Sequence, residues 1–353
     1  MFNMKRNKTK RFKIQDTIMG GQNKVLIQSM CKHKTANVDE VVNEINECAK
    51  LGADLMRVSV LDMEDAEAIK EIKKGISIPL VADIHFDPRL AIAAILNGAD
   101  KIRLNPGNIK DEEQIKEIVE LAKKRKVAIR VGANSGSLNE EFNDYNISLS
   151  HKLVLSAKKQ VEILEKYDFH KIVISLKASN IKETIQAYRL ASEMFPYPLH
   201  IGITEAGPEE ISLIRSVAGL APLLLEGIGN TIRISITGSA QDEVIAAKRL
   251  LHECGLYENY PTLISCPTCG RTQVDCRPLA NKVLKYLEEN NIKLTVAIMG
   301  CVVNGPGEAK QADIGVAGGK GEYAIFKQGQ VIKKVSEEEV YDTLISEINS
   351  LIQ

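Results

Sequence analysis

The feature that most constrains this chain is a unit that recurs from Val25 to about Leu256. Each unit reads as a short apolar strand, a polar turn and an amphipathic helix whose apolar residues recur every three or four positions. Eight such units of similar size predict a closed (β/α)₈ barrel. An open, doubly wound sheet is the alternative, and the lack of a complete glycine-rich dinucleotide fingerprint disfavours it. The predicted strands cover residues 25–30, 54–60, 79–86, 100–105, 127–132, 171–177, 199–205 and 230–237.

Changes along the chain indicate where elements and domains end. The tripeptide Gly-Ala-Asp occurs at 52–54 and at 98–100, each time between a helical pattern and a strand, and glycine commonly ends a helix. From about residue 262 the rhythm changes to a helix at 279–290, a strand at 293–299, a glycine-rich loop, a hairpin and a closing helix. We therefore expect a barrel domain of residues 1–257 and a smaller α+β domain of residues 258–353.

The charge balance argues against two classes of partner. The formal net charge is zero, whereas binding to nucleic acid or to a membrane surface normally requires a basic excess. No apolar run approaches the length of a membrane span, and no apolar segment of a secretion signal follows the basic stretch 1–13. We expect that stretch to be a frayed, solvated end and the protein to be cytoplasmic.

Arginine interrupts four of the predicted strands, at Arg57, Arg103, Arg130 and Arg233. A parallel strand covered on both faces should be continuously apolar, and a buried charge is costly unless it has a partner. In a barrel, the carboxyl ends of the strands form the mouth of the active site. Four guanidinium groups at the mouth would create an anion site that suits phosphate. The structural alternative is that each arginine pairs with a carboxylate of the barrel.

Other polar residues are predicted at the same end of the barrel. A pocket that combines several cations with carboxylates, amides and a hydroxyl suits a small, highly anionic substrate with hydroxyl groups, and a diphosphate is the simplest ligand of this kind. His85 alone is equally compatible with a structural role. The residues concerned are Asp83, His85, Asn105, Asn134, Lys177, Glu205 and Ser235.

Seven cysteines are present, an odd number that favours free thiols or metal ligands in a reducing compartment over a disulfide scaffold. Cys266 and Cys269 form a C-x₂-C pair in LISCPTCGRT, and Cys301 lies in MGCVVNGPGE, a loop that ends at Glu308. No second C-x₂-C or paired histidine is present, so three thiolates and one carboxylate favour an iron–sulfur cluster. Structural zinc and no metal remain alternatives. The other cysteines are expected to be buried small apolar residues: Cys31, Cys48, Cys254 and Cys276.

Several motifs together carry a family resemblance that covers about residues 10–350. They are SCPTCGRTQVD, MGCVVNGPGEAKQADIGVAGG, RVGANSGSL, KIRLNPGN, VADIHF and GITEAG. By these motifs the chain resembles the 4-hydroxy-3-methylbut-2-enyl diphosphate synthases in their short, two-domain bacterial form. The resemblance implies a (β/α)₈ TIM barrel followed by a small α+β domain that holds a [4Fe-4S] cluster and is similar to those of sulfite and nitrite reductases.

The same resemblance implies an oxidoreductase of the methylerythritol phosphate pathway of isoprenoid biosynthesis. Its substrate would be 2-C-methyl-D-erythritol 2,4-cyclodiphosphate. Two electrons from reduced flavodoxin or ferredoxin would open the cyclic diphosphate and remove a hydroxyl group as water. A head-to-tail homodimer is also implied, in which the cluster domain of one subunit caps the barrel of its partner.

The resemblance further implies roles for individual residues. The cluster ligands would be Cys266, Cys269, Cys301 and Glu308. The diphosphate would be held by Arg57, Arg103, Arg130, Lys177 and Ser235. The rest of the substrate would contact Asp83, Asn105, Asn134, Asn304 and Glu205, with Glu205 the residue for proton transfer.

Two other functions are compatible with the residues. One is a non-redox barrel enzyme for phosphorylated ligands, similar to dihydropteroate synthase, with the small domain as a zinc-held cap. The other is a non-catalytic zinc-ribbon adaptor that binds nucleic acid, and the zero net charge and the polar strand ends argue against it.

Overall fold

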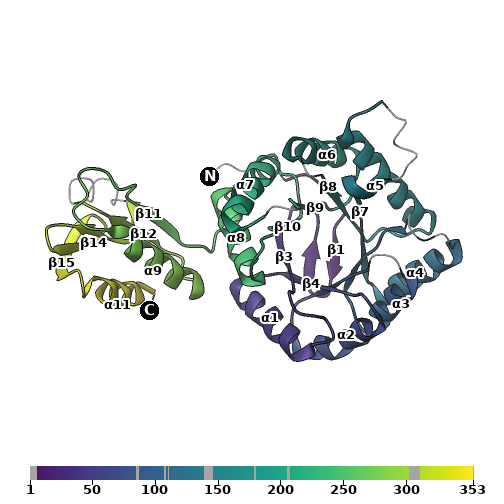
Figure 1. The fold of residues 1–353 in the computed structure, drawn as a ribbon, viewed down its shortest axis with the longest axis horizontal. Coiled ribbons are helices and arrows are strands. Elements are labelled where there is room, and N and C mark those ends of the chain that lie inside the picture. Colours follow the sequence, from purple (N-terminus) through teal and green to yellow (C-terminus); the bar gives the residue numbers. More distant parts are fainter. Residues whose placement is uncertain are drawn as a thin grey trace. The chain divides into compact units, whose positions relative to one another are not determined.

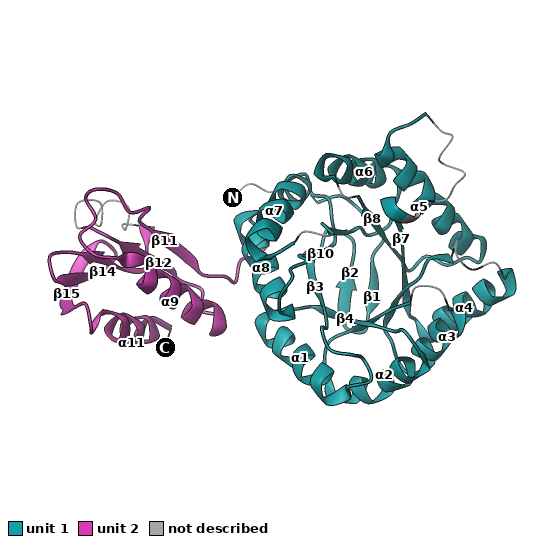
Figure 2. Ribbon diagram, in the orientation of Figure 1, with its two compact units in different colours: residues 1–256 teal, residues 257–353 magenta. Residues whose placement is uncertain are grey.

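The computed structural model describes residues 6–84, 87–106, 109, 111–138, 146–178, 180–204, 207–301 and 311–352. The chain divides into two compact units, residues 1–256 and residues 257–353, which Figure 2 shows in different colours. In the portion of the chain just defined, no helix is both long enough and apolar enough to cross a membrane.

The first unit is a barrel of parallel strands inside a ring of helices (Figure 1). Hydrogen bonding gives the strand order β8-β7-β6-β5-β4-β3-β10-β9, and a parallel bridge between Ile174 and Leu199 joins β8 to the start of β9. The strands are β3 (Leu26–Met30), β4 (Leu55–Ser59), β5 (Leu80–Asp83), β6 (Lys101–Arg103), β7 (Ala128–Asn134), β8 (Ile172–Lys177), β9 (His200–Gly202) and β10 (Thr231–Arg233). The helices are α1 (Val38–Leu51), α2 (Met63–Gly75), α3 (Pro88–Leu96), α4 (Glu112–Arg125), α5 (Leu149–Lys166), α6 (Ile181–Met194), α7 (Glu209–Leu225) and α8 (Ala240–Glu253).

The closed barrel predicted from the sequence is confirmed, and the open-sheet alternative is wrong. Each predicted strand is present, although most are shorter than predicted at one or both ends. The two Gly-Ala-Asp sites end helices as expected, because Gly52 and Gly98 both have a positive φ that residues with a side chain rarely adopt. Most helix starts are capped by a side chain that accepts a backbone N–H, as at Asp62, Asp87, Asp111, Ser148, Asn180 and Ser239.

The barrel interior changes from apolar to polar along the strands. A layer at the amino-terminal end consists of Leu26, Leu55, Val81, Ala128 and Val173. Side chains two positions apart on a strand face the same way, so the next inward positions are Gln28, Arg57, Asp83, Arg130 and Ser175. Every apolar residue of the first layer is thus followed by a polar or charged one, and the polar end of the barrel is the carboxyl end, where barrel enzymes bind their substrates.

A short antiparallel hairpin, β1 (Phe12–Ile14) and β2 (Thr17–Met19), covers the amino-terminal end of the barrel. Ile14 and Met19 are fully buried against the apolar layer. The expectation of a frayed end is therefore wrong for residues 6–13. Arg6 is buried and donates to the carbonyl of Gly229, and Lys10 Nζ lies 3.2 Å from the hydroxyl of Tyr197, because the hairpin anchors this stretch to the barrel.

The second unit is a five-stranded mixed sheet with two helices packed on one face. The strand order is β11-β12-β13-β14-β15, with the first three strands parallel and the last three antiparallel. The predicted helix, strand, hairpin and closing helix are all present, whereas β11 and β13 were not among the predicted elements. The elements are β11 (Thr262–Ser265), α9 (Cys276–Glu289), β12 (Thr295–Met299), β13 (Ile314–Gly318), β14 (Glu322–Lys327), β15 (Gln330–Ser336) and α11 (Val340–Ile352).

Candidate active site

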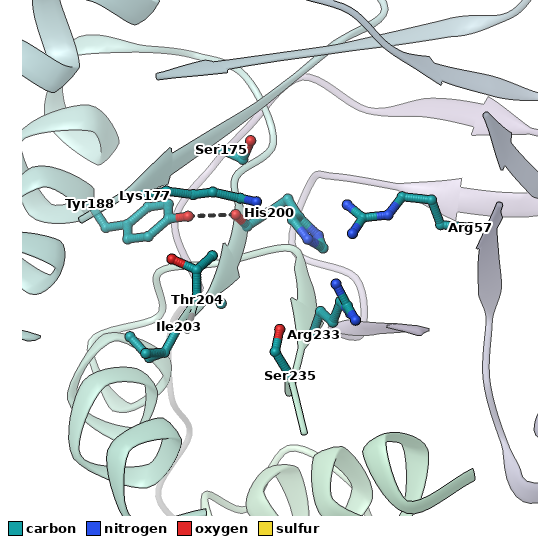
Figure 3. A pocket seen from close by; sticks show the side chains of 10 residues that line it. Arg57, Ser175, Lys177, Tyr188, His200, Ile203, Thr204, Arg233 and Ser235 are labelled. Carbon is teal, nitrogen blue, oxygen red and sulfur yellow. Dashed lines mark hydrogen bonds between the residues drawn. The ribbon is translucent and has the colours of Figure 1, made fainter. Parts of the chain in front are cut away.

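A pocket opens among the carboxyl ends of the barrel strands (Figure 3). Three of the residues singled out for the substrate site line it, namely Arg57, Lys177 and Ser235. Arg233, the fourth strand arginine, lines it as well. The other lining residues were not predicted: Ser175, Tyr188, His200, Gly202, Ile203 and Thr204.

Asp83 at the end of β5 joins two of the strand arginines. Its carboxylate lies 3.7 Å from Nε of Arg57 and 3.7 Å from Nη1 of Arg103. Arg57 is 4% exposed, and its Nη2 also lies 2.9 Å from the sulfur of Met30. Burial lowers the pKa of Arg57 to about 9, while Asp83 acts in the opposite direction. A single carboxylate thus orients two guanidinium groups and leaves an excess of positive charge.

Arg233 has a carboxylate partner of its own. Its Nε and Nη2 lie 3.1 and 3.0 Å from the two carboxylate oxygens of Glu243 on α8, a bidentate pair. Glu243 also accepts from Nζ of Lys32 and from the hydroxyl of Ser29, both at 2.8 Å. Burial would raise the pKa of Glu243, but Arg233 and Lys32 together lower it. Arg233 thus has the carboxylate partner that the structural alternative expected, and it also lines the pocket.

Arg130 on β7 is 1% exposed and does not line the pocket. Its Nε and Nη1 have no hydrogen-bond partner within the part of the chain that the structure describes. Burial lowers the pKa of this guanidinium to about 10. Buried N–H groups without an acceptor are costly, so an anionic ligand that accepted from them would be stabilised.

Lys177 ends β8 and reaches into the pocket (Figure 3). No hydrogen bond or ion pair of its ammonium group is present among the described residues. Burial lowers the pKa of Lys177 to about 7, and Arg130, Arg57 and Arg103 act in the same direction. The charge of this side chain therefore depends on pH within the neutral range.

Two further predicted substrate residues, Asn105 and Asn134, are not among the residues that line this pocket. Asn105 follows β6 and is half-buried. Asn134 is exposed, and its Oδ1 accepts the N–H of Gly136 at 3.1 Å, which caps the 3₁₀ helix η2 (Ser135–Ser137). The other candidates lie outside the described residues: His85, Glu205, Asn304 and Glu308.

A polar layer beneath the mouth was not predicted from the sequence. Lys101 on β6 is fully buried and donates from Nζ to Oε1 of Gln28 on β3 at 2.8 Å. His200 on β9 is also buried, with its Nδ1 2.6 Å from the hydroxyl of Thr231 on β10. The signal was available, because Lys101 stands two positions before Arg103 and therefore faces the same way.

The second unit brings cysteines to the ends of neighbouring strands. Ser265 of β11 pairs with Ile298 of β12, and the N–H of Cys266 donates to the carbonyl of Ile298 at 3.0 Å. Cys266 and Cys301 therefore follow the carboxyl ends of two adjacent parallel strands. Cys301 is 5% exposed, Cys266 is half-buried and Cys269 is exposed. Soft thiolate donors in this placement fit an iron–sulfur cluster.

The C-x₂-C loop is closed by Thr272 and joined to the residue after β12 by Gln273, whose N–H donates to the carbonyl of Gly300 at 2.9 Å. Thr272 accepts the N–H of Cys269 on its hydroxyl at 3.0 Å, and its own N–H donates to the carbonyl of Cys269 at 2.9 Å. Gly300 makes room for it, since a Cβ there would lie 2.8 Å from Cγ2 of Thr272. The loop is thus held beside Cys301 by contacts within the chain.

The thiols of this region differ in acidity. The backbone N–H of Arg271 lowers the pKa of Cys269, which favours the thiolate that a metal requires. Burial raises the pKa of Cys276, and this cysteine is 1% exposed in the domain core. The burial expected of the four non-ligand cysteines is confirmed for all of them: Cys31, Cys48, Cys254 and Cys276. Across the described ranges, no three His, Cys, Asp or Glu side chains gather as a metal site would require, and Glu308 is outside those ranges.

The fold is shared with known barrel enzymes. Dihydropteroate synthase from Yersinia pestis matches with a TM-score of 0.51 and 13% identity, over 69% of this chain and 98% of that one. The enzyme from Stenotrophomonas maltophilia matches with a TM-score of 0.53 and 13% identity, over 70% of this chain and 97% of that one. At this level of identity the likeness concerns the barrel fold alone.

Sequence comparison covers both units. The model of the GcpE TIM-barrel domain matches residues 9–248, and that of the GcpE C-terminal domain matches residues 262–350. A protein of Caldanaerobacter subterraneus subsp. tengcongensis is 50% identical over 99% of this chain and 98% of its own length. One of Clostridium perfringens is 48% identical over 99% of this chain and 100% of its own length. Both are named 4-hydroxy-3-methylbut-2-en-1-yl diphosphate synthase (flavodoxin). The chain belongs to the GcpE family.

Proposed function

We propose that the protein catalyses the reductive ring opening and dehydroxylation of 2-C-methyl-D-erythritol 2,4-cyclodiphosphate to 4-hydroxy-3-methylbut-2-enyl diphosphate. The observation that carries this proposal is the identity of about half of the residues, over almost the full length, to proteins named for that product. The reaction consumes two electrons and protons, opens the ring at a phosphate oxygen and releases one hydroxyl group as water. It supplies a precursor for isoprenoid biosynthesis.

The cationic mouth of the barrel supports a diphosphate as the ligand. Arg57 and Arg103 share the carboxylate of Asp83, and Lys177 lies close enough to both arginines for their charges to lower its pKa. Ring opening places negative charge on the departing phosphate oxygen, and fixed guanidinium groups stabilise that charge as it develops. We assign the diphosphate to Arg57, Arg103, Arg130, Lys177 and Ser235.

The remaining candidate residues are assigned either to substrate binding or to proton transfer. Asp83 keeps Arg57 and Arg103 oriented through its two ion pairs. We propose that Asn105, Asn134 and Asn304 contact the rest of the substrate, and that Glu205 after β9 transfers a proton to the hydroxyl group that departs.

The cysteine-bearing ends of β11 and β12 support a [4Fe-4S] cluster, for which we propose Cys266, Cys269, Cys301 and Glu308 as ligands. Such a cluster supplies single electrons and a Lewis-acidic iron when it is bound. The N–H of Gln273 donates to the carbonyl of Gly300 at 2.9 Å and so holds the end of the C-x₂-C loop next to Cys301. Residues 1–256 would then be the substrate-binding domain and residues 257–353 the cluster domain.

The partners follow from this chemistry. We propose reduced flavodoxin as the electron donor, with ferredoxin as a substitute, and a cytoplasmic location where such carriers occur. We also propose a head-to-tail homodimer in which the cluster domain of one subunit serves the barrel of the other. An exposed apolar face on α7 supports a second copy as partner, because single-copy soluble proteins rarely expose such a stripe.

The test is to purify the full chain anaerobically and to measure iron, acid-labile sulfide and zinc. We expect about four irons and four sulfides per chain, followed by conversion of the cyclodiphosphate when an artificial reductant is supplied. Stoichiometric zinc without sulfide would favour the non-redox barrel enzyme instead. A cluster-loaded protein that does not convert the cyclodiphosphate would contradict the assigned substrate.

A further inference from the structure

His200 occupies a central place in the pocket, although the sequence pattern gave it no role. It is the first residue of β9, it is 5% exposed, and it lines the pocket together with Arg57 and Lys177. Figure 3 shows its ring projecting toward the guanidinium group of Arg57, with the side chain of Lys177 on the other side. Any ligand held by those two cations comes within reach of the imidazole.

The ring is fixed from the neighbouring strand. Thr231 on β10 is the register partner of His200, and its hydroxyl lies 2.6 Å from Nδ1. The backbone is held as well, because the hydroxyl of Tyr188 donates to the carbonyl of His200 at 2.7 Å. Tyr188 in turn accepts the N–H of Leu176 at 3.0 Å. Side chain and backbone are therefore both held in place before any ligand arrives.

The second ring nitrogen is available to the pocket. Among the described residues, Nε2 of His200 has no hydrogen-bond partner. Burial lowers the pKa of His200 well below its usual value, and the surrounding cations Arg130, Lys101, Arg57 and Lys177 act in the same direction. The imidazole is therefore neutral and carries one N–H.

We propose that His200 is a ligand-binding residue of this pocket, whose neutral Nε2–H donates to a phosphoryl oxygen of the bound cyclodiphosphate. The inference rests on the proposed function and adds a binding residue to it. In this arrangement the hydroxyl of Thr231 donates to Nδ1, which leaves the ring proton on Nε2. The other tautomer would aim a lone pair at an anion.

A neutral donor is suited to this position. The arginines and Lys177 already supply the charge that attracts an anion, and an additional imidazolium would repel them in the ligand-free pocket. An uncharged N–H in a fixed direction instead selects where the phosphoryl oxygen lies. His200 therefore adds geometric selectivity where the cations add attraction.

The test measures binding of the cyclodiphosphate by calorimetry to the full-length, cluster-loaded protein. We expect His200→Phe to weaken binding about tenfold, since it removes one hydrogen bond to a charged group. His200→Gln, which keeps an N–H donor, should recover part of that loss. Thr231→Val should weaken binding by about threefold, and the double variant should be no worse than His200→Phe alone, because both changes act through the same hydrogen bond.

The matched control is His170→Phe. His170 makes the same kind of contact, with Nδ1 3.0 Å from the hydroxyl of Tyr197, but it precedes β8 and so lies at the opposite end of the barrel. Its loss should leave binding unchanged. If the wild-type protein binds the cyclodiphosphate and the affinity of His200→Phe is within twofold of the wild-type value, the inference is overturned. The proposed function would remain intact in that case.

A second readout does not depend on how well the variants fold. Nitrogen-15 spectra of the wild-type protein with labelled histidines report the tautomer of each ring. With ligand bound, we expect His200 to be neutral and protonated on Nε2. Protonation on Nδ1 would contradict the inference, and a wild-type protein that does not bind the cyclodiphosphate would overturn the proposed function and this inference with it.

Discussion

The surroundings of Lys177 at the barrel mouth lower the pKa of its ammonium group into the neutral range. Its pKa is about 7 in the ligand-free pocket, so it is largely protonated at pH 6 and largely neutral at pH 8. An anionic ligand favours the ammonium form, and binding above pH 7 therefore requires proton uptake. We expect the affinity for the cyclodiphosphate to fall by about tenfold between pH 6 and pH 8, because the charged fraction of Lys177 falls by about that factor over this range. Calorimetry in buffers of different ionisation enthalpy measures both the affinity and the protons taken up.

Lys177→Arg is the matched variant, because a guanidinium remains charged throughout this range. Its affinity should change by less than about twofold from pH 6 to pH 8, with no proton uptake. The ligand does not add a slope of its own, since each phosphorus of the cyclic diphosphate carries only a strongly acidic hydroxyl. A wild-type affinity that is flat across this range would show that Lys177 is charged throughout.

The assignment of Cys301, rather than Cys276, as a cluster ligand can be tested by single substitutions. Cys301 follows the strand adjacent to that of Cys266, whereas Cys276 is packed in the core of the cluster domain with a raised pKa. We expect Cys301→Ser to abolish the visible absorption of the cluster and to lower iron and sulfide to background. Cys276→Ser should retain both. The reverse pattern would exchange the two assignments.

Among single residues, the sequence predicted those that interrupt an expected pattern. Arg57, Arg103 and Arg130 stood out because a charge is unexpected inside an apolar strand. Lys101 and His200 lie at the start of their strands, where a polar residue reads as a turn. The position of Lys101 two residues before Arg103 indicates that it faces inward, but a single strand does not show which side chains face it across the barrel.

The N-terminal hairpin is an element that was not predicted from the sequence. The basic stretch 1–13 suggested a solvated end, yet Ile14 and Met19 of the hairpin that follows point inward and close the apolar end of the barrel. We expect Ile14→Ala to lower the free energy of unfolding of the barrel by about 2–5 kcal/mol, the range for a buried isoleucine. Denaturant unfolding followed by a barrel-specific probe measures the loss.

Lys13 provides the control for that experiment, since it is the exposed neighbour of Ile14 on the same strand. Lys13→Ala should change the free energy of unfolding by less than about 0.5 kcal/mol. Neither change should alter affinity for the cyclodiphosphate, because the hairpin lies at the end of the barrel opposite the pocket. An equal effect of both variants would mean that the hairpin contributes little to barrel stability.

Helices and strands were predictable where a local sequence pattern specifies them. The eight barrel strands and their helices have the period-dependent signals of buried strands and amphipathic helices, and capping residues and glycines mark the helix ends. β11 and β13 have weaker signals. β11 is only partly buried, and both are parallel neighbours of β12, so their pairing depends on segments more than fifteen residues away.

For the whole molecule, the proposed dimer leads to a test on α7. Its outward face carries Ile211, Ile214, Val217 and Leu225, which are 47%, 67%, 48% and 54% exposed. Pairing with a second copy would bury this face, and a charge at its centre would have to be buried with it. We expect the wild-type protein to have about twice the chain mass of 38.9 kDa in light scattering. Ile214→Glu should raise the dissociation constant of the dimer at least about 30-fold. Leu96→Glu, at a leucine on α3 that is 51% exposed, should stay dimeric. The Ile214→Glu variant also tests the head-to-tail arrangement. If the cluster of one subunit serves the barrel of the other, Ile214→Glu should keep its iron and sulfide but lose turnover at concentrations where it is monomeric.

A monomeric Ile214→Glu protein with full turnover would contradict the head-to-tail arrangement. An Ile214→Glu protein that remains dimeric would exclude α7 as the interface.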